Sequence, residues 1–508
     1  MKVVSIDLGT SGVKVAVVDH TGRVLASASE PIPTVTGPDG AAEQDAQGWW
    51  DAIGRCTRGL AGRVDRIDAV AVTAQYFSTV AIGPDGTPRS RVVLWMDHRG
   101  GPLHPLDGDG EAFFLWLDRH GLPPLSNDGI AHIALLRSLE PQLVGATDVV
   151  FVEPVDAVVS RLLGRPVATQ NSAFGSMAID NRVHGSTSYD DEMLERAGLT
   201  TAMLPTLVPM DASVGGLCAA AAEHLGIPAG TPLLPGTLDS ITSAVGTGAV
   251  SPDVISLVIG TTSVIVSHVP ERSADLDHAI GAVPSPVDGS YFVMAENGVG
   301  GKALDVALRQ WFLAEDTLSD VPFPADAFER AERLAGSAPA GANGAMFFPW
   351  LAGSISPAPN DDVRGGFTNL GLTTTRADLL RAVYEGVAFN ARWLLGPVEQ
   401  FTGRPCDVLR FGGGAARSPF WADVLASVTN RPVLRLADAP YTNARGAALL
   451  AAVQLGELAW SDLLGLVPVE QVHEPVAADA ERYAELGARF AEHHATLADF
   501  HRTLPQHP

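Results

Sequence analysis

An acid and a glycine-rich turn lie together at the start of this sequence. Two β-branched apolar runs within Val3–Val18 flank the turn Gly9-Thr10-Ser11-Gly12, with Asp7 inside the first run and Lys14 opening the second. An acid in an apolar strand needs a partner or a metal ion. Glycines at a bend leave backbone N–H groups free, and such groups can hold phosphate without cationic side chains. The stretch therefore predicts a β-hairpin that holds phosphate, with Asp7 as a candidate metal-linked residue.

This hairpin differs from a P-loop. No Gly-Lys-Ser/Thr follows the turn, and a second strand takes the place of the helix. An ordinary N-terminal hairpin, in which Asp7 is a turn-edge acid, fits the hairpin alone equally well. The sequence elsewhere has to separate the two interpretations.

A second hairpin of the same design lies half a chain away. The segment Ser256–Val266 aligns on Ser5–Val15 without a gap, and Val258 and Ile265 stand in the places of Asp7 and Lys14. The match predicts a duplicated fold whose two similar domains face each other. One charged and one uncharged phosphate loop suit a nucleotide–metal site shared across a cleft. A chance likeness of two Gly-Thr turns is the alternative.

Another acid, Asp239, follows the apolar segment Pro232–Pro235 and Gly236. Open α/β sheets place ligands where strand ends face a crevice. Asp239 would also serve as the N-cap of a helix over Ser240–Val245, so both interpretations stay open at this point.

The scaffold that must position these residues is large and acidic. The chain has 508 residues, 46% apolar and 18% charged, with a formal net charge of −24. This length predicts two or more domains, and the charge argues against a nucleic-acid or anionic-membrane partner. The cysteines Cys56, Cys218 and Cys406 are scattered, which predicts reduced thiols in a cytoplasmic protein. There is no signal-peptide pattern and no uncharged run of transmembrane length.

Strands and helices alternate along the chain in the predicted order. After the first hairpin we expect strands over 23–28, 67–73, 79–82, 92–95, 232–235, 256–266 and 408–411. We expect helices over 45–62, 190–197, 219–225, 304–312, 325–334, 377–395, 418–430, 445–455 and 480–504, and a helical pattern throughout 111–164. The last helix has one apolar face, which predicts packing on its own domain.

Several of these motifs occur together in a known family. They are the first hairpin, Glu43-Gln44-Asp45 before Trp49-Trp50, the Trp95-Met96-Asp97-x-Arg99 segment, Pro-Gly-Thr-Leu-Asp239, the second Gly-Thr-Thr hairpin, and Phe411-Gly-Gly-Gly-Ala-x-x-Ser-Pro-x-Trp421. The last is the most specific. In these motifs the chain resembles the FGGY carbohydrate kinases over almost its whole length. Among the members of that family it is most similar to the xylulokinases.

The resemblance implies an α/β fold of two actin-like (ribonuclease H-like) domains, each a mixed sheet flanked by helices. The expected domains are residues 1–248, with the sugar site, the first phosphate hairpin and the catalytic acid, and residues 249–508, with the second hairpin and the adenosine pocket. They would close over ATP and a sugar bound in the cleft between them. Members of this family commonly form homodimers.

The resemblance also assigns roles to residues. Asp239 matches the catalytic base and also contacts the sugar, and Asp7 is the candidate for Mg²⁺, through water because Mg²⁺ loses water reluctantly. The expected phosphate and nucleotide contacts are Gly9, Thr10, Ser11, Lys14, Gly260, Thr261, Thr262, Gly301, Gly413, Gly414, Ala415 and Ser418. Without the resemblance, the run Gly412–Gly414 is also compatible with a bare turn.

The expected sugar contacts are Gln75, Tyr76, Phe77 and Asp97. Xylulokinases resemble one another in a Gln-Met-His segment where this chain has Gln75-Tyr76-Phe77. Tyr76 and Phe77 therefore depart from the pattern, and the identity of the sugar stays open. These rings either stack on a sugar or belong to the core. Asp97 and Arg99 either bind hydroxyls or form a surface ion pair.

The sequence thus predicts an ATP- and Mg²⁺-dependent kinase of a small sugar, with D-xylulose as the first candidate. Another ketose, a polyol or an aldonate, such as ribulose or gluconate, is the alternative within the same chemistry. A nucleotide-regulated sensor or structural actin-like protein is the alternative of another class. The presence of both Asp7 and Asp239 argues against it, because a binding protein needs no base.

Overall fold

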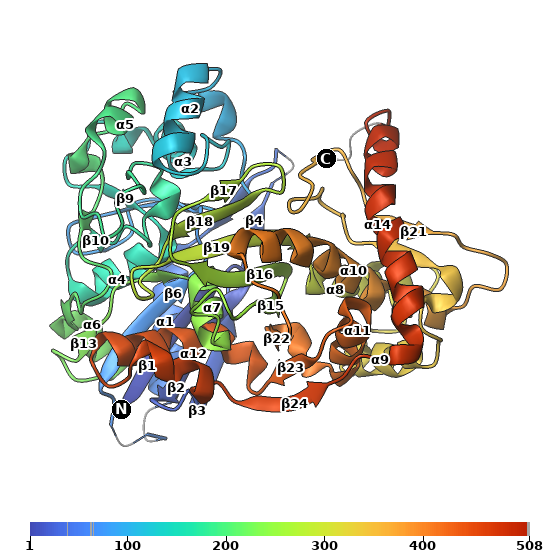
Figure 1. Ribbon diagram of the computed structural model, residues 1–508. Helices are drawn as coiled ribbons and strands as arrows, with labels where there is room; N and C mark the ends of the chain where they lie inside the picture. The colour runs from blue at the N-terminus through green and yellow to red at the C-terminus, as the bar shows by residue number, and fades with distance from the viewer. Residues whose placement is uncertain (38, 61–62, 65, 505–508) are drawn as a thin grey trace.

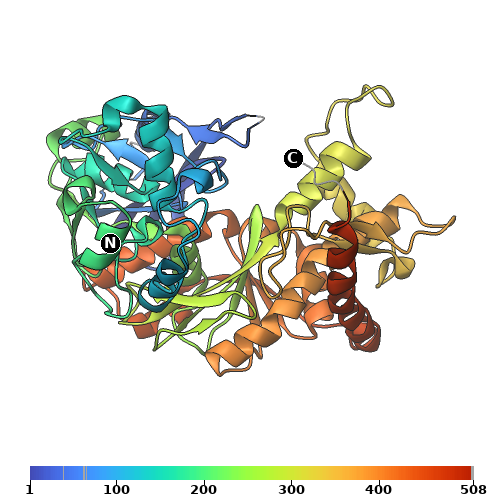
Figure 2. The ribbon, with the colours of Figure 1, turned by 90° about the horizontal axis from the view of Figure 1, so that it is seen from above.

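Two mixed β-sheets, one from each half of the chain, form the frame of the molecule (Figure 1). The computed structural model describes residues 1–37, 39–60, 63–64 and 66–504. Seen from above in Figure 2, the halves form two lobes that meet along one side and diverge on the other. Helices cover both sheets, as the sequence predicts for an α/β fold.

The first sheet is built around the N-terminal hairpin. Strands β1 and β2 are antiparallel, β3 pairs antiparallel with β2, and β6 runs parallel to β1 on its other side. The strands are β1 (Lys2–Gly9), β2 (Gly12–Asp19), β3 (Val24–Pro31), β6 (Ala69–Ala74), β12 (Gly215–Gly216), β13 (Pro232–Leu233) and β14 (Thr237–Leu238).

The second sheet repeats this arrangement. Strands β15 and β16 are antiparallel, β19 pairs antiparallel with β16, and β22 runs parallel to β15. The strands are β15 (Ser256–Ile259), β16 (Thr262–Val269), β17 (Ala274–Asp275), β18 (Ile280–Pro284), β19 (Tyr291–Val299), β22 (Leu409–Gly412), β23 (Val433–Leu436) and β24 (Val469–His473). The repeated pairing agrees with the sequence match between the hairpins.

The two hairpins nevertheless differ in register by one residue. In the first, Asp7 lies opposite Lys14 and Gly9 opposite Gly12. In the second, Val258 lies opposite Val264, although the ungapped alignment would place Ile265 there. Five residues therefore lie between Val258 and its partner, against six between Asp7 and Lys14, and a strand irregularity follows between Thr262 and Val264.

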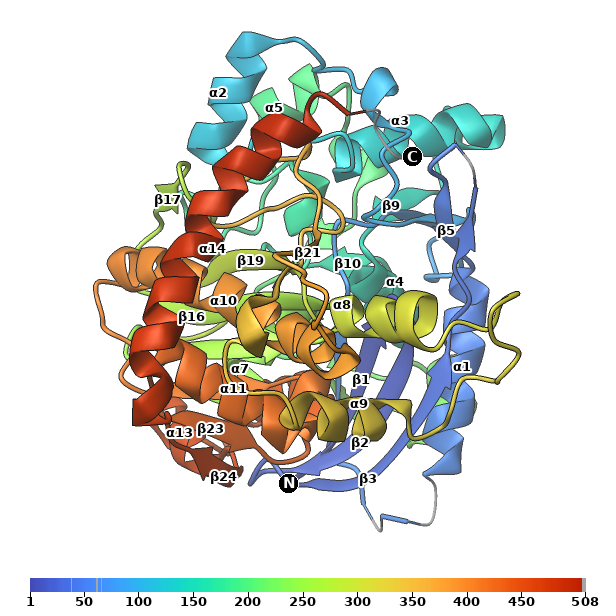
Figure 3. The ribbon, with the colours of Figure 1, turned by 90° about the vertical axis from the view of Figure 1, so that its right-hand side faces the viewer.

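Each sheet is covered on one face by helices of its own half. Helices α1 (Ala46–Gly59), α4 (Pro154–Leu163) and α6 (Ala219–Leu225) pack on the first sheet. Helices α10 (Arg376–Thr402) and α11 (Pro419–Thr429) pack on the second. Helix α14 (Ala480–His501) lies against α10 and α11, as the one-faced pattern predicts (Figure 3).

Two helices are exchanged between the halves. Helix α12 (Thr442–Gln454) packs its alanines on Val3 and Ala16 of the first sheet, while α7 (Asp239–Thr247) packs Ile241 and Ala244 on Val258 and Val266 of the second. The two helices cross in direct backbone contact. A Cβ atom on Gly246 would lie 2.0 Å from the carbonyl oxygen of Thr442, and one on Gly446 would lie 1.8 Å from that of Thr242.

Smaller elements surround the frame. One small sheet has three strands, β4 (Val35–Thr36), β5 (Ala42–Gln44) and β8 (Val92–Val93). Three others have two strands each: β7 (Val80–Ile82) with β9 (Val150–Val152), β10 (Val167–Ala168) with β11 (Thr206–Leu207), and β20 (Met346–Phe348) with β21 (Gly366–Thr368). The remaining helices are α2 (Gly110–Arg119), α3 (Gly129–Leu139), α5 (Asp191–Arg196), α8 (Gly301–Val306), α9 (Ala327–Gly336) and α13 (Leu463–Leu466).

The prediction of a helical pattern throughout residues 111–164 is wrong in part. Three helices occur there, but the strand β9 interrupts them, because the apolar run Val149–Val152 pairs with β7 as a buried strand. Short apolar runs cannot be assigned to strand or helix by periodicity alone. The predicted end of α1 at about Gly62 lies outside the described residues. None of the described helices is long and apolar enough to cross a membrane.

Candidate active site

Asp239 is the first residue of α7. Leu238 occupies the N-cap position, so the interpretation of Asp239 as an N-cap is wrong. The preceding strand β14 runs parallel to β6, with Thr237 opposite Thr73. The hydroxyl groups of Thr73 and Thr242 lie 2.8 Å apart and join β6 to the first turn of α7. Asp239 is thus fixed at the carboxyl end of a strand of the first sheet.

The surroundings of Asp239 make it a proton acceptor at neutral pH. Burial, and then the nearby charge of Asp7, raise its pKa from 3.8 to about 7. The N–H and hydroxyl groups of Ser240 and the charge of Lys14 oppose this shift. A general base works best when its pKa lies near the operating pH.

Asp7 and Lys14 face each other across the first hairpin. Asp7 is 2% exposed, and its Oδ2 lies 3.4 Å from Lys14 Nζ. Asp7 lies inside β1 rather than at the edge of the turn, and it acts electrostatically on Asp239. The first hairpin and the start of α7 therefore belong to one acidic site.

Side chains from other segments form hydrogen bonds with Thr10 of the first turn. The hydroxyl of Thr10 donates to Gln75 Oε1 at 2.5 Å and accepts from Trp95 Nε1 at 3.1 Å. The amide of Gln44 donates to the carbonyl oxygen of Thr10 at 2.7 Å. Because these contacts occupy the hydroxyl of Thr10, we expect Thr10 itself to contact a phosphate through its backbone N–H. Gln75, predicted to contact sugar, is buried against the hairpin.

The second turn lies between two glycine segments. The N–H of Gly301 donates to the carbonyl oxygen of Gly260 at 2.9 Å, and a Cβ on Gly301 would lie 2.4 Å from that oxygen. Gly413 has a φ of +82°, and its Cβ would lie 2.5 Å from the carbonyl oxygen of Ile259. Only glycine allows these approaches.

The predicted nucleotide residues of the second half are thereby brought together. Gly260, Thr261, Thr262, Gly301, Gly413, Gly414 and Ala415 lie on or beside the second turn. Space around Gly260 and Gly414 is open, with no atom within 4 Å of an added Cβ. Ser418 caps α11 by accepting from the N–H of Trp421 at 2.9 Å, so it has a structural task whatever it binds.

The aromatic loop after β6 connects both halves. The hydroxyl of Tyr76 lies 3.4 Å from Ser240 Oγ and 3.5 Å from Met294 Sδ of β19. Phe77, with a φ of +54°, packs its ring edge-on against Phe174. Tyr76 thus faces the acidic site, whereas Phe77 belongs to the core.

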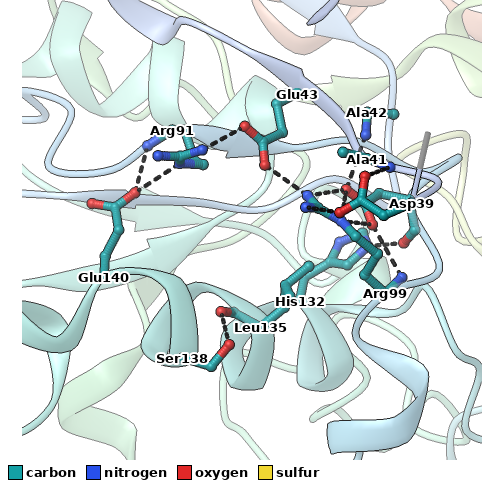
Figure 4. A network of polar contacts seen from close by, with 11 residues as sticks. Asp39, Ala41, Ala42, Glu43, Arg91, Arg99, His132, Leu135, Ser138 and Glu140 are labelled. Carbon is teal, nitrogen blue, oxygen red and sulfur yellow. Dashed lines mark hydrogen bonds and ion pairs between the residues drawn. The ribbon is translucent and has the colours of Figure 1, made fainter. Parts of the chain in front are cut away.

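Asp97 is paired with Arg99, and Figure 4 shows how Arg99 continues through Glu43 to Arg91. The carboxylate of Asp97 is fully buried and accepts from Arg99 Nε at 3.0 Å and Nη2 at 2.7 Å, and from the N–H of Ala42 at 3.0 Å. Glu43 joins Arg99 to Arg91 through contacts of 2.6 and 2.7 Å. Burial acts to raise the pKa of Asp97, but the hydrogen bonds from Arg99 and Ala42 hold this pKa below its usual range. The pair is buried, unlike the surface pair considered from the sequence.

Sequence reasoning missed the carboxyl group of Glu296 on β19. Burial, and the proximity of Asp239, raise its pKa to about 8, against hydrogen bonds from Thr262 and Gly298. The only signal in the sequence was its place shortly before Gly300-Gly301.

Comparison with known proteins identifies the family. The model of the FGGY carbohydrate kinase N-terminal domain matches residues 2–246, and that of the C-terminal domain matches residues 255–455. The chain belongs to the FGGY family of carbohydrate kinases. It is therefore a sugar kinase, and kinases of this family use ATP.

Similar FGGY proteins carry several names. The chain is 26% identical to a xylulose kinase of Staphylococcus epidermidis over 95% of this chain and 94% of that protein. It is 24% identical to a gluconokinase of Bacillus subtilis (95% and 93%) and 28% identical to an erythritol kinase of Brucella abortus (95% and 94%). Among solved structures, a xylulose kinase of Rhodospirillum rubrum matches with a TM-score of 0.82 and 26% identity, covering 99% of this chain and all of that one.

Proposed function

We propose that this FGGY kinase transfers the γ-phosphoryl group of ATP to a hydroxyl of D-xylulose, giving D-xylulose 5-phosphate, with Asp239 as the general base. The observation that carries the base assignment is the position of Asp239 at a strand end beside Asp7, with a pKa raised to about 7. A base of this kind is half ionised at neutral pH and can accept a proton from a hydroxyl.

The reaction balances as a single displacement. Asp239 accepts the hydroxyl proton while the sugar oxygen bonds to the γ-phosphorus. The bond between the γ-phosphorus and its bridging oxygen breaks, and ADP leaves with that oxygen. Since the protein contributes mainly positioning and electrostatics, the phosphate contacts matter as much as the base.

The two hairpins would hold the phosphates. In this proposal the backbone at Gly9, Thr10 and Ser11 and the charge of Lys14 contact them from the first half, and Gly260, Thr261 and Thr262 from the second. Gly301, Gly413, Gly414, Ala415 and Ser418 would border the adenosine. The open space around Gly260 and Gly414 supports this.

Asp7 fits a Mg²⁺ ion bound through water. No group of three or more His, Cys, Asp or Glu among the described residues is arranged to hold a metal. Mg²⁺ in kinases takes one or two carboxylates and fills its other positions with water and phosphate oxygens, which one buried acid can satisfy. When bound, the ion would neutralise charge on the phosphates. A homodimer remains a prediction from the family resemblance, and a cytoplasmic location remains a prediction from the scattered cysteines.

The names of the similar proteins support D-xylulose, and also an alternative. Xylulose kinases, a gluconokinase and an erythritol kinase are similar to this chain at comparable identity. Tyr76 and Ser240 adjoin Asp239, so they are the proposed direct sugar contacts. Gln75, Phe77 and Asp97, which the sequence also predicts to contact sugar, are engaged by the first turn, by Phe174 and by Arg99. Another ketose, a polyol or an aldonate is the second candidate.

The test is ADP release with MgATP and a panel of D-xylulose, D-ribulose, erythritol and gluconate. We expect the highest kcat/KM with D-xylulose. A higher value with another acceptor would replace the substrate, and no ADP above background with any acceptor would favour the non-catalytic sensor. Asp239→Asn should abolish sugar-dependent release, and unchanged release would overturn the base assignment.

A further inference from the structure

One carboxyl oxygen of Glu296 lacks a partner within the protein. Its Oε1 is buried and accepts no hydrogen bond among the described residues. Thr262 and the N–H of Gly298 lie close enough to the carboxyl group to oppose the rise of its pKa, but no hydrogen bond from the described residues reaches Oε1. Since an unpaired buried polar atom costs about 1–3 kcal/mol, such an atom is expected to find a partner in water or a ligand.

This carboxyl group lies close enough to Tyr76 and Asp239 to interact with both electrostatically. Glu296 acts electrostatically on Tyr76 and is itself influenced by Asp239. It shares β19 with Met294, whose sulfur lies 3.5 Å from the Tyr76 hydroxyl. The second half of the chain thus presents an acid to the same space as the base and the aromatic loop of the first half.

The ionisable side chains around this space are mainly acids, although with a pKa of about 8 Glu296 is mostly protonated at neutral pH. Asp7 raises the pKa of Asp239, and Asp239 raises those of Glu296 and Tyr76. The cation that acts on Asp239 is Lys14, which is already paired with Asp7. A complex of Mg²⁺ with ATP is itself anionic, so bound nucleotide does not reverse this balance.

Nearby cations are also engaged. Arg99, four residues after the Trp95 that bonds to Thr10 of the first turn, is held by Asp97, Glu43 and Asp39. Of the described cations, Lys14 and Arg99 are therefore both paired already, so a substrate carboxylate could use neither as a free partner, and burial of an unpaired charge is costly.

We propose that the acceptor of this kinase is an uncharged polyhydroxy compound, that aldonates are rejected, and that Glu296 binds one of its hydroxyl groups. This inference rests on the proposed function, because it places the acceptor beside Asp239. It names Glu296 as a specificity-determining residue supplied by the second half, so that the sugar contacts both halves.

The first test compares gluconate with the uncharged acceptors D-xylulose, D-ribulose and erythritol, using the wild-type enzyme and MgATP. We expect kcat/KM for gluconate to be at least about 100-fold below that of the best uncharged acceptor. A gluconate value within about threefold of the best uncharged acceptor would overturn the rejection of aldonates, as would a higher one.

The second test replaces Glu296. Glu296→Met removes the hydrogen-bonding atoms at similar length, and we expect KM for the best uncharged acceptor to rise about 10- to 100-fold, with kcat within about threefold. Glu296→Gln keeps an acceptor and a donor and should restore KM to within about threefold of wild type. KM for ATP should stay unchanged in both.

Glu385→Gln serves as the matched control, because Glu385 is a buried carboxyl of the second half that is paired with Arg381 and Tyr483. It should change thermal stability but not the acceptor KM. An unchanged acceptor KM in Glu296→Met would overturn the role of Glu296, as would a fall in kcat alone.

Failure of this inference is distinguishable from failure of the proposed function. If D-xylulose is phosphorylated but gluconate is equally good, the proposed function stands and the inference falls. If D-xylulose is inactive but erythritol is active and its KM depends on Glu296, the named substrate falls and the inference stands.

Discussion

Replacing Asp239 by Asn should remove activity and at the same time stabilise the protein. The activity part follows from the base role, since loss of a positioned base typically costs 10²–10⁴ in rate. With a pKa of about 7, Asp239 is about one-tenth ionised at pH 6 and about nine-tenths ionised at pH 8. The wild-type kcat/KM should therefore fall about tenfold for each pH unit below 7, and the residual rate of the variant should lack this dependence.

The stability part follows from the same shift. The pKa of Asp239 is higher in the folded protein than its ordinary 3.8, so the folded state binds more protons between pH 3.8 and about 7. Stability is lost as pH rises through this window, and the loss is complete above it. The shift corresponds to at most about 4 kcal/mol, of which at most about 2.5 kcal/mol appears between pH 5 and pH 8. Because Asp239 is half-buried rather than fully enclosed, solvent screens part of this shift, and we expect about 1–2 kcal/mol over that interval.

The assay is urea unfolding of the ligand-free protein at pH 5 and pH 8, with Asp211→Asn at an exposed position as the control. Asp239→Asn should gain stability over wild type at pH 8 and less at pH 5. If the variant and the wild type differ in free energy of unfolding by the same amount at pH 5 and pH 8, the raised pKa of Asp239 is refuted. An acid limb near pH 7 that persists in the variant would refute its role as the base.

Three further predictions concern the scaffold. Gly446→Val at the crossing of α7 and α12 should lower the free energy of unfolding in urea by more than about 3 kcal/mol. Gly465→Ala is the control, because the space around Gly465 is open, and it should change that free energy by less than about 1 kcal/mol. Equal effects of the two substitutions would contradict the close crossing. Asp97→Asn should cost about 3–5 kcal/mol because it leaves Arg99 partly unpaired; a raised sugar KM at unchanged stability would instead support direct sugar binding. Trp95→Phe removes the hydrogen bond from the indole N–H to Thr10 of the first turn. We expect KM for ATP to rise about two- to tenfold in steady-state assays. An unchanged KM would mean that the conformation of the turn does not depend on this hydrogen bond.

The chemistry of the site was predictable where it depends on neighbours in sequence. The first hairpin is encoded by β-branched runs and a glycine turn, so its strands and the place of Asp7 could be read directly. The repeat at Ser256–Val266 predicted the second sheet for the same reason. Both acids, Asp7 and Asp239, were identified before any distance between elements was known.

Interactions between distant segments were not predictable. Asp97 looked equally like a sugar ligand and a surface ion pair, and only its burial against Ala42 and Arg99 assigns it to the network. Glu296 had no sequence signal beyond its place shortly before Gly300-Gly301, because its importance comes from its proximity to Asp239 of the other half.

The sequence alone thus determined the two hairpins, the two acids and the family to which they belong, because those features lie in short contiguous stretches. The tertiary structure alone decided the exchange of α7 and α12 between the sheets, since small residues such as Gly246 and Gly446 reveal a crossing only when their partners are known. It also decided the sign and strength of the field at Asp239, because burial and the approach of Asp7 exist only in the folded chain.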